Sequence, residues 1–403
     1  MNLMENRIRP YAWGSRTAIA ELLGAPSPSP HPQAELWIGA HPGDPSALVC
    51  ADGHTENLNA VIEADPVRML GRAVYDEFGA RLPFLLKVLA AAEPLSLQAH
   101  PSTQQAERGF DSEERGGIPL GAHWRNYKDR YHKPELICAL TQFEALCGFR
   151  EPSTTVRLLS ELQVPALDHY LALLSGQPDA HGMRALFSSI ITVPSGVLEP
   201  LLDDVLAACV RKVREKSEFG AEYRTALELG ERYPGDVGVI ASLLMNRITL
   251  QPNEAIYLHA GNLHAYLSGV GVEIMASSDN VLRGGLTPKH VDVPELMRVL
   301  DFEPGPMPVF DGAADERGIH DYGTPIKEFR LSRLELDGRS FDLRHSGPQV
   351  LLVTEGSAKL TAPDGRQLTI ARGRSAWIAA DEGAIQCTGT GVAFRATDGF
   401  VPG

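Results

Sequence analysis

The sequence has few cysteines and no cysteine motif of the kind that binds zinc or builds a disulfide framework. Its five cysteines are far apart among 403 residues and include no Cys-x-x-Cys pair. Their odd number argues against a small secreted domain held together by disulfides. We therefore expect a protein of a reducing compartment, the cytoplasm.

The chain also lacks an excess of positive charge and long hydrophobic runs. Lysine and arginine number 37 against 51 for aspartate and glutamate, a formal net charge of −14, and the basic residues are scattered. This pattern does not favour nucleic acid or an anionic membrane as a partner. No run of about 18 uninterrupted apolar residues occurs, and "MNLMENRIRPYAWGS" at the start has no apolar signal-peptide core. We expect neither export by that route nor a membrane span.

The apolar pattern divides the chain into three parts. Residues 1–150 hold short apolar runs separated by Pro, Gly and Asp clusters, as do residues 233–327, and both predict strands with loops. In residues 151–232 apolar positions recur at spacings of three and four, which predicts amphipathic helices. Residues 328–403 alternate in period two between Gly-containing turns. The prediction is a mainly β protein: a discontinuous first domain (1–150 and 233–327), a helical insert (151–232) and a separate C-terminal β domain (328–403).

Polar side chains interrupt the apolar runs at three places. In "PLSLQAHPS" Gln98 and His100 are two residues apart, so on a strand they project from the same face. Glu135 follows Pro134 in "HKPEL", and His264 follows a Gly-Asn turn in "LHAYL". Together Gln98, His100, Glu135 and His264 form a nitrogen and oxygen donor set that suits zinc or another divalent first-row metal. A single buried His or Gln more often hydrogen-bonds the backbone, so the pattern alone leaves that alternative open.

Several long motifs follow one another in an order that resembles a known enzyme family. They are "YAWGS" (11–15), "ELWIGAHPGDPS" (35–46), "PFLLKVLAAAEPLSLQAHPS" (83–102), "NYKDRYHKPEL" (126–136), "FEALCGFR" (143–150) and "LHAGNLHAYLSGVGVEIMASSDNVLRGGLTPKHVDVPEL" (258–296). Together they resemble type I phosphomannose isomerase, a zinc-dependent cupin family that interconverts mannose 6-phosphate and fructose 6-phosphate.

The resemblance implies a fold, a metal and a substrate class. The implied fold is a cupin (jelly-roll) catalytic barrel, a helical domain and a second, metal-free cupin-like domain at the C-terminus. The implied cofactor is one Zn²⁺ per chain, with Gln98, His100, Glu135 and His264 as its ligands. The implied partner is a small sugar phosphate, and we expect a monomer.

Such a reaction needs a group that moves a proton between C1 and C2 of the sugar. Lys133 and His132 lie directly beside Glu135 in the sequence and are our candidates, with Glu273 and Asp279 as alternatives. The sequence does not decide among them.

The substrate's phosphate needs a local cationic pocket in a protein of net charge −14. Arg283 in "NVLRGGLTPKH" is the first candidate and also counts as a catalytic residue, because a guanidinium binds phosphate in bidentate fashion. Further candidates for substrate binding are Lys289, Lys87, Ser96, Tyr266 and Asp279. Lys87 lies inside an apolar run, so its ammonium either reaches the edge of its strand or needs a buried anion.

Two hypotheses from different classes remain at this point. The first is the sugar-phosphate isomerase. The second is a cupin that uses the same metal differently, as an oxygenase or a sugar-binding protein, because this fold hosts many unrelated functions. A phosphate clamp at Arg283 and Lys289 would distinguish them. His259 precedes the Gly-Asn turn, and we expect a structural role for it rather than a metal contact.

Overall fold

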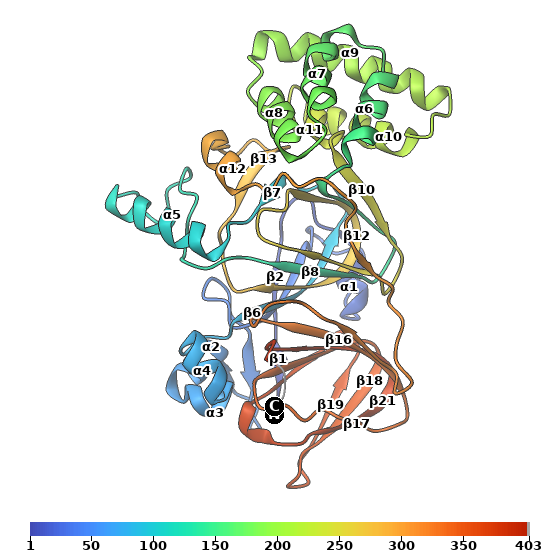
Figure 1. Cartoon of the computed structure of the whole chain (residues 1–403). Coiled ribbons are helices and arrows are strands. Elements are labelled where there is room, and N and C mark those ends of the chain that lie inside the picture. The colour runs from blue at the N-terminus through green and yellow to red at the C-terminus, as the bar shows by residue number, and fades with distance from the viewer. Residues whose placement is uncertain (401–403) are drawn as a thin grey trace.

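The computed structural model describes residues 1–400 and shows two large β-sheets with a group of helices at one end (Figure 1). One sheet has 11 strands and the other has 10. The helical group lies at the far end of the 11-stranded sheet from the 10-stranded sheet (Figure 1). The prediction of a mainly β fold with a helical part is confirmed.

Strand β12 connects two groups of strands within the 11-stranded sheet, because its two halves pair with different strands. The first half of β12, from His264 to Ser268, pairs with β9, and the second half, from Gly269 to Ala276, pairs with β6 and β8. The bend falls at Gly269, whose φ of +120° and close approach to the backbone of Gln142 leave no room for a side chain. Hydrogen bonding does not close the sheet into a continuous barrel. Its strands are β2 (Arg7–Arg9), β3 (Glu35–Gly39), β6 (Phe84–Ala91), β7 (Leu97–Ala99), β8 (Glu135–Ala139), β9 (Phe143–Phe149), β10 (Met245–Leu250), β11 (Ala255–Leu258), β12 (His264–Ala276), β13 (Leu282–Gly285) and β14 (Val309–Phe310).

The 10-stranded sheet combines the C-terminal strands with the N-terminus. Its order is β15-β16-β21-β18-β20-β1-β4-β5, with β17 and β19 paired beside β21 and β18. Strand β1 therefore lies inside this sheet, between β20 and β4. The strands are β1 (Asn2–Glu5), β4 (Ala47–Val49), β5 (Thr55–Asn57), β15 (Ile319–Tyr322), β16 (Arg330–Asp337), β17 (Phe341–Asp342), β18 (Gln349–Thr361), β19 (Gln367–Ala371), β20 (Ser375–Ile378) and β21 (Gln386–Thr397).

Strand pairing and the sequence-based domain boundaries divide the chain differently. The sequence assigns residues 1–150 and 233–327 to the first domain, yet β1 pairs with β20 and β15 with β16, and β4 and β5 extend the same sheet beyond β1. The partner of a short strand is set by contacts hundreds of residues away, and local pattern carries no information about it.

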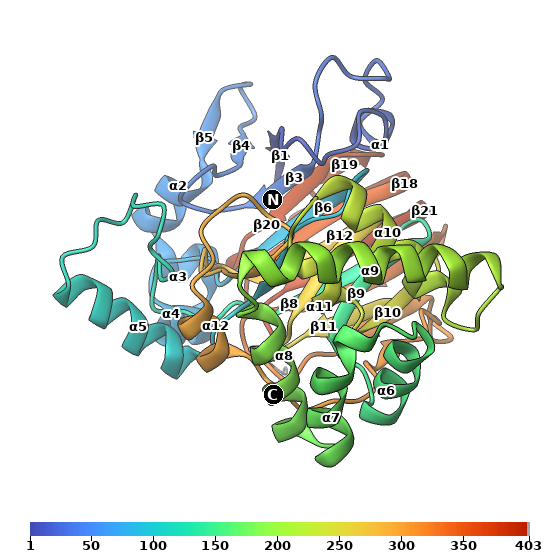
Figure 2. The same cartoon turned by 90° about the horizontal axis from the view of Figure 1, so that it is seen from above.

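The helices of residues 152–242 pack into one buried cluster, which also includes residues of the 11-stranded sheet such as Leu97 and Ala265. On α9 (Ser195–Arg214) the buried residues include Leu198, Leu201, Leu202 and Val205, the spacing that predicted a helix there. Figure 2 shows α9 and α10 crossing above the strands of the 11-stranded sheet. The group comprises α6 (Pro152–Glu161), η1 (Pro165–Leu167), α7 (Asp168–Gly176), α8 (Ala180–Ile191), α9, α10 (Gly220–Arg232) and α11 (Gly238–Ser242).

One hydrophobic cluster lies between the two sheets, in addition to clusters within each. Leu86 and Val272 of the 11-stranded sheet belong to the same buried cluster as Val350, Leu352 and Phe394 of the 10-stranded sheet. The remaining helices lie around this body: α1 (Ala18–Leu22), α2 (Leu58–Ala64), α3 (Pro66–Leu70), α4 (Arg72–Phe78), α5 (Thr103–Arg115), α12 (Val293–Val299) and η2 (Ala380–Glu382).

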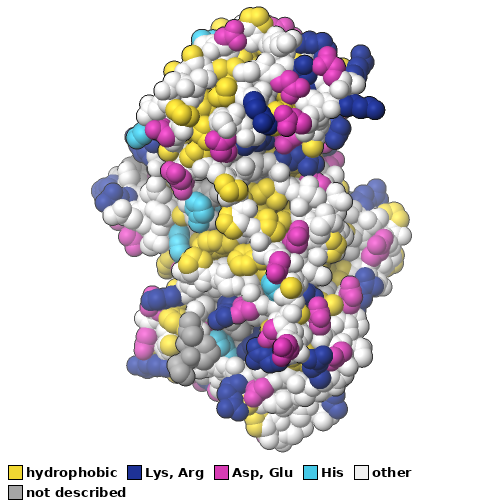
Figure 3. Space-filling view, turned by 45° about the vertical axis from the view of Figure 1, so that its right-hand side comes forward, with side chains coloured by type: hydrophobic (Ala, Val, Ile, Leu, Met, Phe, Trp, Pro, Cys, Tyr) yellow, Lys and Arg dark blue, Asp and Glu magenta, His cyan; other side chains and the backbone are white. Residues whose placement is uncertain are grey.

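Within residues 1–400 no single helix has the length and apolar character to cross a membrane; only the pair α8 and α9, bent by 108°, meets the criteria of length and composition together. On the face shown in Figure 3, basic side chains are interspersed with acidic ones, and hydrophobic side chains gather across the middle of the molecule.

Candidate metal centre and cavity

Neighbouring strands bring the candidate ligands together, with Glu135 at the start of β8, which pairs with the second half of β12. Strand β7 pairs Gln98 with His264 of β12 on one side and with Arg283 of β13 on the other. His100 follows β7 directly, just before the capping box that starts α5 at Ser102. Residues far apart in the sequence therefore meet through backbone register.

Glu135 stands between the two histidines. Its Oε1 lies 3.3 Å from His100 Nε2, and its Oε2 lies 3.4 Å from His264 Nε2. The three side chains are at most 3% exposed, and one ligand atom from each lies within 4.8 Å of the others. Gln98 lines the cavity onto which Glu135 also opens.

Backbone carbonyls fix the orientation of both imidazoles. His100 Nδ1 lies 2.7 Å from the carbonyl oxygen of Asn280, and His264 Nδ1 lies 3.0 Å from that of Asn262. A proton on each Nδ1 leaves the Nε2 lone pair facing Glu135. His100 Nε2, His264 Nε2 and Glu135 Oε2 are buried without a hydrogen-bond partner in the described chain. Buried polar atoms without partners are rare, and neutral imidazoles facing a carboxylate fit a divalent cation.

The protonation states agree with this donor set. Burial, with the nearby charge of Lys133, lowers the pKa of His100 to about 4, which keeps its imidazole neutral. Burial alone would raise the pKa of Glu135, but the neighbouring positive charge of Lys133 opposes this and the pKa lies well below its ordinary value. The carboxylate therefore stays ionised.

A cavity of about 490 Å³ opens onto this cluster. It brings together most of the residues that the sequence singles out. Those that line it are Lys87, Ser96, Gln98, Lys133, Glu135, Tyr266, Glu273, Arg283 and Lys289.

Lys133 and Lys87 lie in this cavity in different environments. Lys133 Nζ is 3.3 Å from Glu135 Oε1, beside the metal-type cluster. Lys87 Nζ is 3.0 Å from Glu273 Oε2 and 3.6 Å from Glu35 Oε1, on neighbouring strands. Burial opposes the charge of Lys87, yet Glu273 and Glu35 raise its pKa overall. The buried ammonium of Lys87 is therefore neutralised by carboxylates of the protein itself.

This buried network extends to aromatic groups. Tyr266 donates to Glu273 Oε1 at 2.9 Å, and the Trp37 indole donates to Glu35 Oε2 at 2.6 Å. Our sequence analysis missed Glu35. The spacing of Glu35 and Trp37 in "ELW", two residues apart on one strand face, is the signal that could have found it.

Arg283 and Lys289 are the cations of the cavity that no carboxylate neutralises within residues 1–400. Burial alone lowers the pKa of Arg283, and burial together with Arg283 lowers that of Lys289. Two neighbouring cations at a cavity wall, without internal partners, suit a dianion.

Three residues that the sequence discusses lie elsewhere. The His132 ring bonds Glu328 at 2.6 Å and does not line the cavity. Asp279 pairs with His41 at 3.2 Å and lies outside the cavity lining. His259 is exposed, its Nδ1 bonded to the carbonyl oxygen of Ala260.

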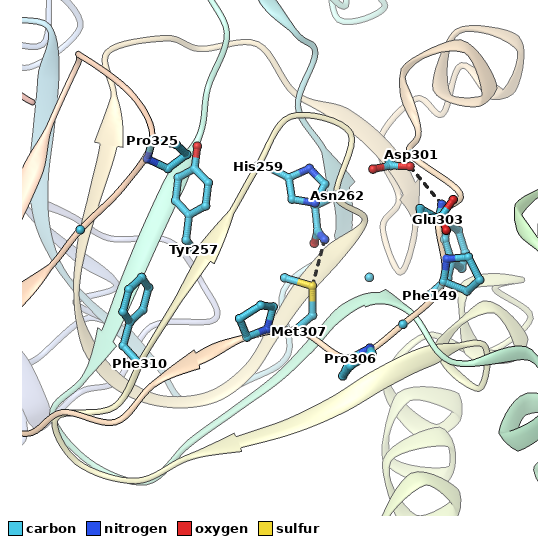
Figure 4. Close-up of a pocket in the computed structure, with 15 residues that line it drawn as sticks. Phe149, Tyr257, His259, Asn262, Asp301, Glu303, Pro306, Met307, Phe310 and Pro325 are labelled. Carbon is cyan, nitrogen blue, oxygen red and sulfur yellow. Dashed lines mark hydrogen bonds between the residues drawn. The ribbon is translucent and has the colours of Figure 1, made fainter.

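A second cavity of about 400 Å³ is lined in part by Asn262, two residues before His264 in the chain (Figure 4). Its lining includes Tyr257, Phe310, Met307 and His259 but no lysine or arginine. The side chain of Asn262 bonds Met307 Sδ at 3.4 Å there. This cavity contains none of the metal-type ligand atoms.

The fold and the site define a class of protein: a cupin-type β protein with a buried His, His and Glu cluster suited to a metal ion, beside a cavity that Glu135 lines. Comparisons with known proteins specify it further. The family model "Phosphomannose isomerase type I, catalytic domain" matches residues 1–152. Mannose-6-phosphate isomerase of Salmonella typhimurium is 41% identical over 394 residues, which is 97% of this chain and 98% of that protein. The human mannose-6-phosphate isomerase is 32% identical over 93% of this chain and 92% of its own length.

Solved structures agree with the sequence relatives. A phosphomannose isomerase variant from Salmonella typhimurium superposes with a TM-score of 0.90 at 38% identity, covering 99% of this chain and 100% of that chain. A zinc-bound mannose 6-phosphate isomerase gives a TM-score of 0.89 at 39% identity, with 99% of each chain covered. The chain belongs to the type I phosphomannose isomerase family.

Proposed function

We propose that this protein interconverts mannose 6-phosphate and fructose 6-phosphate. The observation that carries the proposal is the cavity itself. Gln98 and Glu135 line one part of it, with the buried, unpartnered Nε2 atoms of His100 and His264 directly beside Glu135. Arg283 and Lys289 line another part, without carboxylate partners in the described chain. A substrate with a metal-binding carbonyl at one end and a phosphate at the other matches both the metal-ligand part and the cationic part of the cavity. The family's named activity has these requirements.

We propose that one Zn²⁺ is held by Gln98, His100, Glu135 and His264. When bound, the ion acts as a Lewis acid toward the carbonyl and hydroxyl oxygens of the open-chain sugar and so favours loss of a carbon-bound proton. The amide oxygen of Gln98 is a neutral donor, so the set carries one negative charge rather than two.

Lys133 is our proposed proton-transfer residue. It lines the cavity beside Glu135, whereas His132 is bonded to Glu328 and Asp279 to His41. Glu273 also lines the cavity but accepts from Lys87 and Tyr266. Lys133 Nζ, acting as a neutral amine, would take the proton from C2 of mannose 6-phosphate, become an ammonium and return the proton to C1, the carbon-to-carbon transfer that turns the aldose into the ketose.

Arg283 and Lys289 would hold the phosphate, with Ser96 as a further donor on the cavity wall. Lys87 has a different role in this proposal. Because Glu273 and Glu35 already neutralise it, it orders the cavity wall together with Tyr266 rather than binding the dianion directly.

The organisation of the chain also remains a proposal. A catalytic part, a helical part and a C-terminal β part fit the packing, with the N-terminal strands β1, β4 and β5 joined to the C-terminal sheet. We further propose a cytoplasmic monomer. In support of that location, all five cysteines are free, and four of them are buried.

The first test is conversion of mannose 6-phosphate to fructose 6-phosphate by purified protein, before and after chelation and after zinc is restored. We expect chelation to abolish turnover and zinc to restore it. Gln98→Ala should lower both turnover and bound zinc. Gln104→Ala, on the exposed face of α5, is the matched control and should change neither.

A second variant tests the phosphate end independently of the metal. Arg283→Gln should raise KM for mannose 6-phosphate and leave the zinc content at one per chain. Folded, zinc-loaded protein without turnover would refute the isomerase and favour a cupin that uses its metal for oxygen chemistry or binding.

A further inference from the structure

The segment that carries both unpaired cations, from strand β13 into the loop that follows it, has a strained backbone. Between Arg283 and Lys289, Gly285 has φ of +125° and Leu286 has φ of +54°. A branched residue such as leucine rarely adopts positive φ, because Cβ then approaches the following carbonyl oxygen. Surrounding structure must hold such a conformation in place.

One carboxylate from the helical part of the chain supplies that hold. Asp236 Oδ1 accepts hydrogen bonds from the backbone N–H of Leu286 at 2.9 Å and of Gly238 at 2.7 Å. Its Oδ2 accepts from the N–H of Thr287 at 3.2 Å. Hydrogen bonds to an ionised acceptor are stronger than those between neutral groups.

The loop after β13 and the start of α11 fit against each other only because each has a glycine at the point of contact. A Cβ on Gly238 would lie 2.8 Å from Leu286 N, and a Cβ on Gly285 would lie 2.9 Å from Asp236 Oδ1 and 3.0 Å from the Cα of Gly238. The loop and the start of α11 are therefore in backbone contact. The same segment also bonds the opposite wall, since Tyr233 OH donates to the carbonyl oxygen of Pro94 at 2.8 Å.

We propose that Asp236 is a positioning residue for the substrate's phosphate: its carboxylate fixes the backbone of Leu286 and Thr287, and thereby the places of Arg283 and Lys289. This inference rests on the proposed function. Asp236 does not line the sugar-phosphate cavity, whereas Leu286, Thr287 and both cations do. Its effect on substrate therefore passes through the loop. The helical part of the chain thus contributes to substrate binding and does not only cover the sheet.

The test compares Asp236→Ala with Asp236→Asn in zinc-loaded full-length protein. The alanine variant loses all three accepted hydrogen bonds, whereas asparagine keeps one acceptor oxygen and loses the charge. We expect Asp236→Ala to raise KM for mannose 6-phosphate about tenfold, with kcat changed less than about threefold and zinc content unchanged. Asp236→Asn should fall between Asp236→Ala and the parent protein. Asp204→Asn, on an exposed position of α9, is the matched control.

Binding of inorganic phosphate, measured by calorimetry on the same proteins, separates this inference from the proposed function. If the parent protein binds phosphate but does not isomerise mannose 6-phosphate, the proposed function fails, and weaker phosphate binding by Asp236→Asn still supports the positioning role. Lower melting temperature with unchanged KM and phosphate affinity would show a purely structural role and overturn the inference. A parent protein that binds no phosphate would overturn it too, as would a loss confined to kcat.

Discussion

The two sheets have similar strands but different interiors. In the 11-stranded sheet, buried positions carry Lys87, Glu273, His100, Glu135 and His264. In the 10-stranded sheet, the separate core cluster is apolar and includes Leu351, Val353, Leu360 and Ile378. Burying charge is costly unless it is paired or binds a ligand. The difference teaches that strand pattern sets the architecture, whereas inward-facing polar residues that line a cavity mark which sheet has a site, since the buried Arg333 of the other sheet is bonded to Glu335 and Gly312.

The buried polar groups of the 10-stranded sheet serve a different purpose. Gln349 donates to the carbonyl oxygen of Leu343 at 3.0 Å and accepts from Arg395 at 2.7 Å, and the His345 ring bonds Asp398 at 2.7 Å. These contacts join loops and strands to one another. At the candidate metal centre, by contrast, three unpartnered atoms face one another.

The largest effect is expected from a substitution in the metal site itself. Glu135→Ala removes the carboxylate between the two histidines, so kcat/KM should fall on the order of 10³-fold, because metal activation supplies several kcal/mol. Bound zinc, measured by metal analysis, should fall with it. Glu355→Ala, exposed on β18 of the other sheet, is the control. Full activity in Glu135→Ala would remove this residue from the metal site.

Removing the buried ammonium tests whether charge pairing stabilises the same interior. Lys87→Met leaves Glu273 and Glu35 without their cation, and the free energy of unfolding should fall by about 3–5 kcal/mol. The double variant Lys87→Met/Glu273→Gln should recover part of the loss in a denaturant titration. Lys359→Met, exposed on β18, should change stability by less than about 0.5 kcal/mol. Equal losses in single and double variants would contradict the pairing.

Removal of an apolar side chain from the core of the 10-stranded sheet should lower stability and leave substrate and zinc binding unchanged. Leu351→Ala empties a fully buried position and should lower the free energy of unfolding by about 2–5 kcal/mol. At a temperature where the variant is folded, KM and bound zinc should match those of the parent protein. A raised KM would mean that the 10-stranded sheet contributes to the site, which would contradict the assignment of the site to the 11-stranded sheet.

The smallest expected effect concerns the junction between the first sheet and the helices. Glu151 caps α6, and hydrogen bonds from the side chain of Ser153 and from the backbone of Thr154 and Ser153 lower the pKa of Glu151 to about 2. A depressed carboxyl pKa stabilises the folded state above the ordinary value of 4.5, and this contribution is lost as pH falls toward 2. Glu151→Gln should therefore lower stability at pH 7 by at most about 1 kcal/mol, and the difference should disappear in acid.

The measurement is the melting temperature of the parent protein and of Glu151→Gln, taken between pH 7 and the lowest pH at which both remain folded. Glu199→Gln, exposed on α9, should show no such pH-dependent difference. A difference that grows as the pH falls would have the wrong sign for a depressed pKa.

The sequence predicted the local features well, for identifiable reasons. The period of apolar residues in α9 marked a helix, since one face must be buried. The Gln-x-His spacing marked two side chains on one strand face. Local pattern failed where the partner is distant: the N-terminal strand β1 pairs with β20, and Asn280 provides the carbonyl that orients His100.

By itself, the sequence determined the kinds of element, the donor types Gln, His and Glu, and the inward faces of their strands, because these follow from side-chain chemistry and the periods of helix and strand. Only the tertiary structure decided that His264 stands opposite Gln98, that Lys87 is neutralised by Glu273 and Glu35, and that His132 turns away from the cavity. Those outcomes depend on strand register and long-range pairing, which the cooperative packing of the whole chain sets.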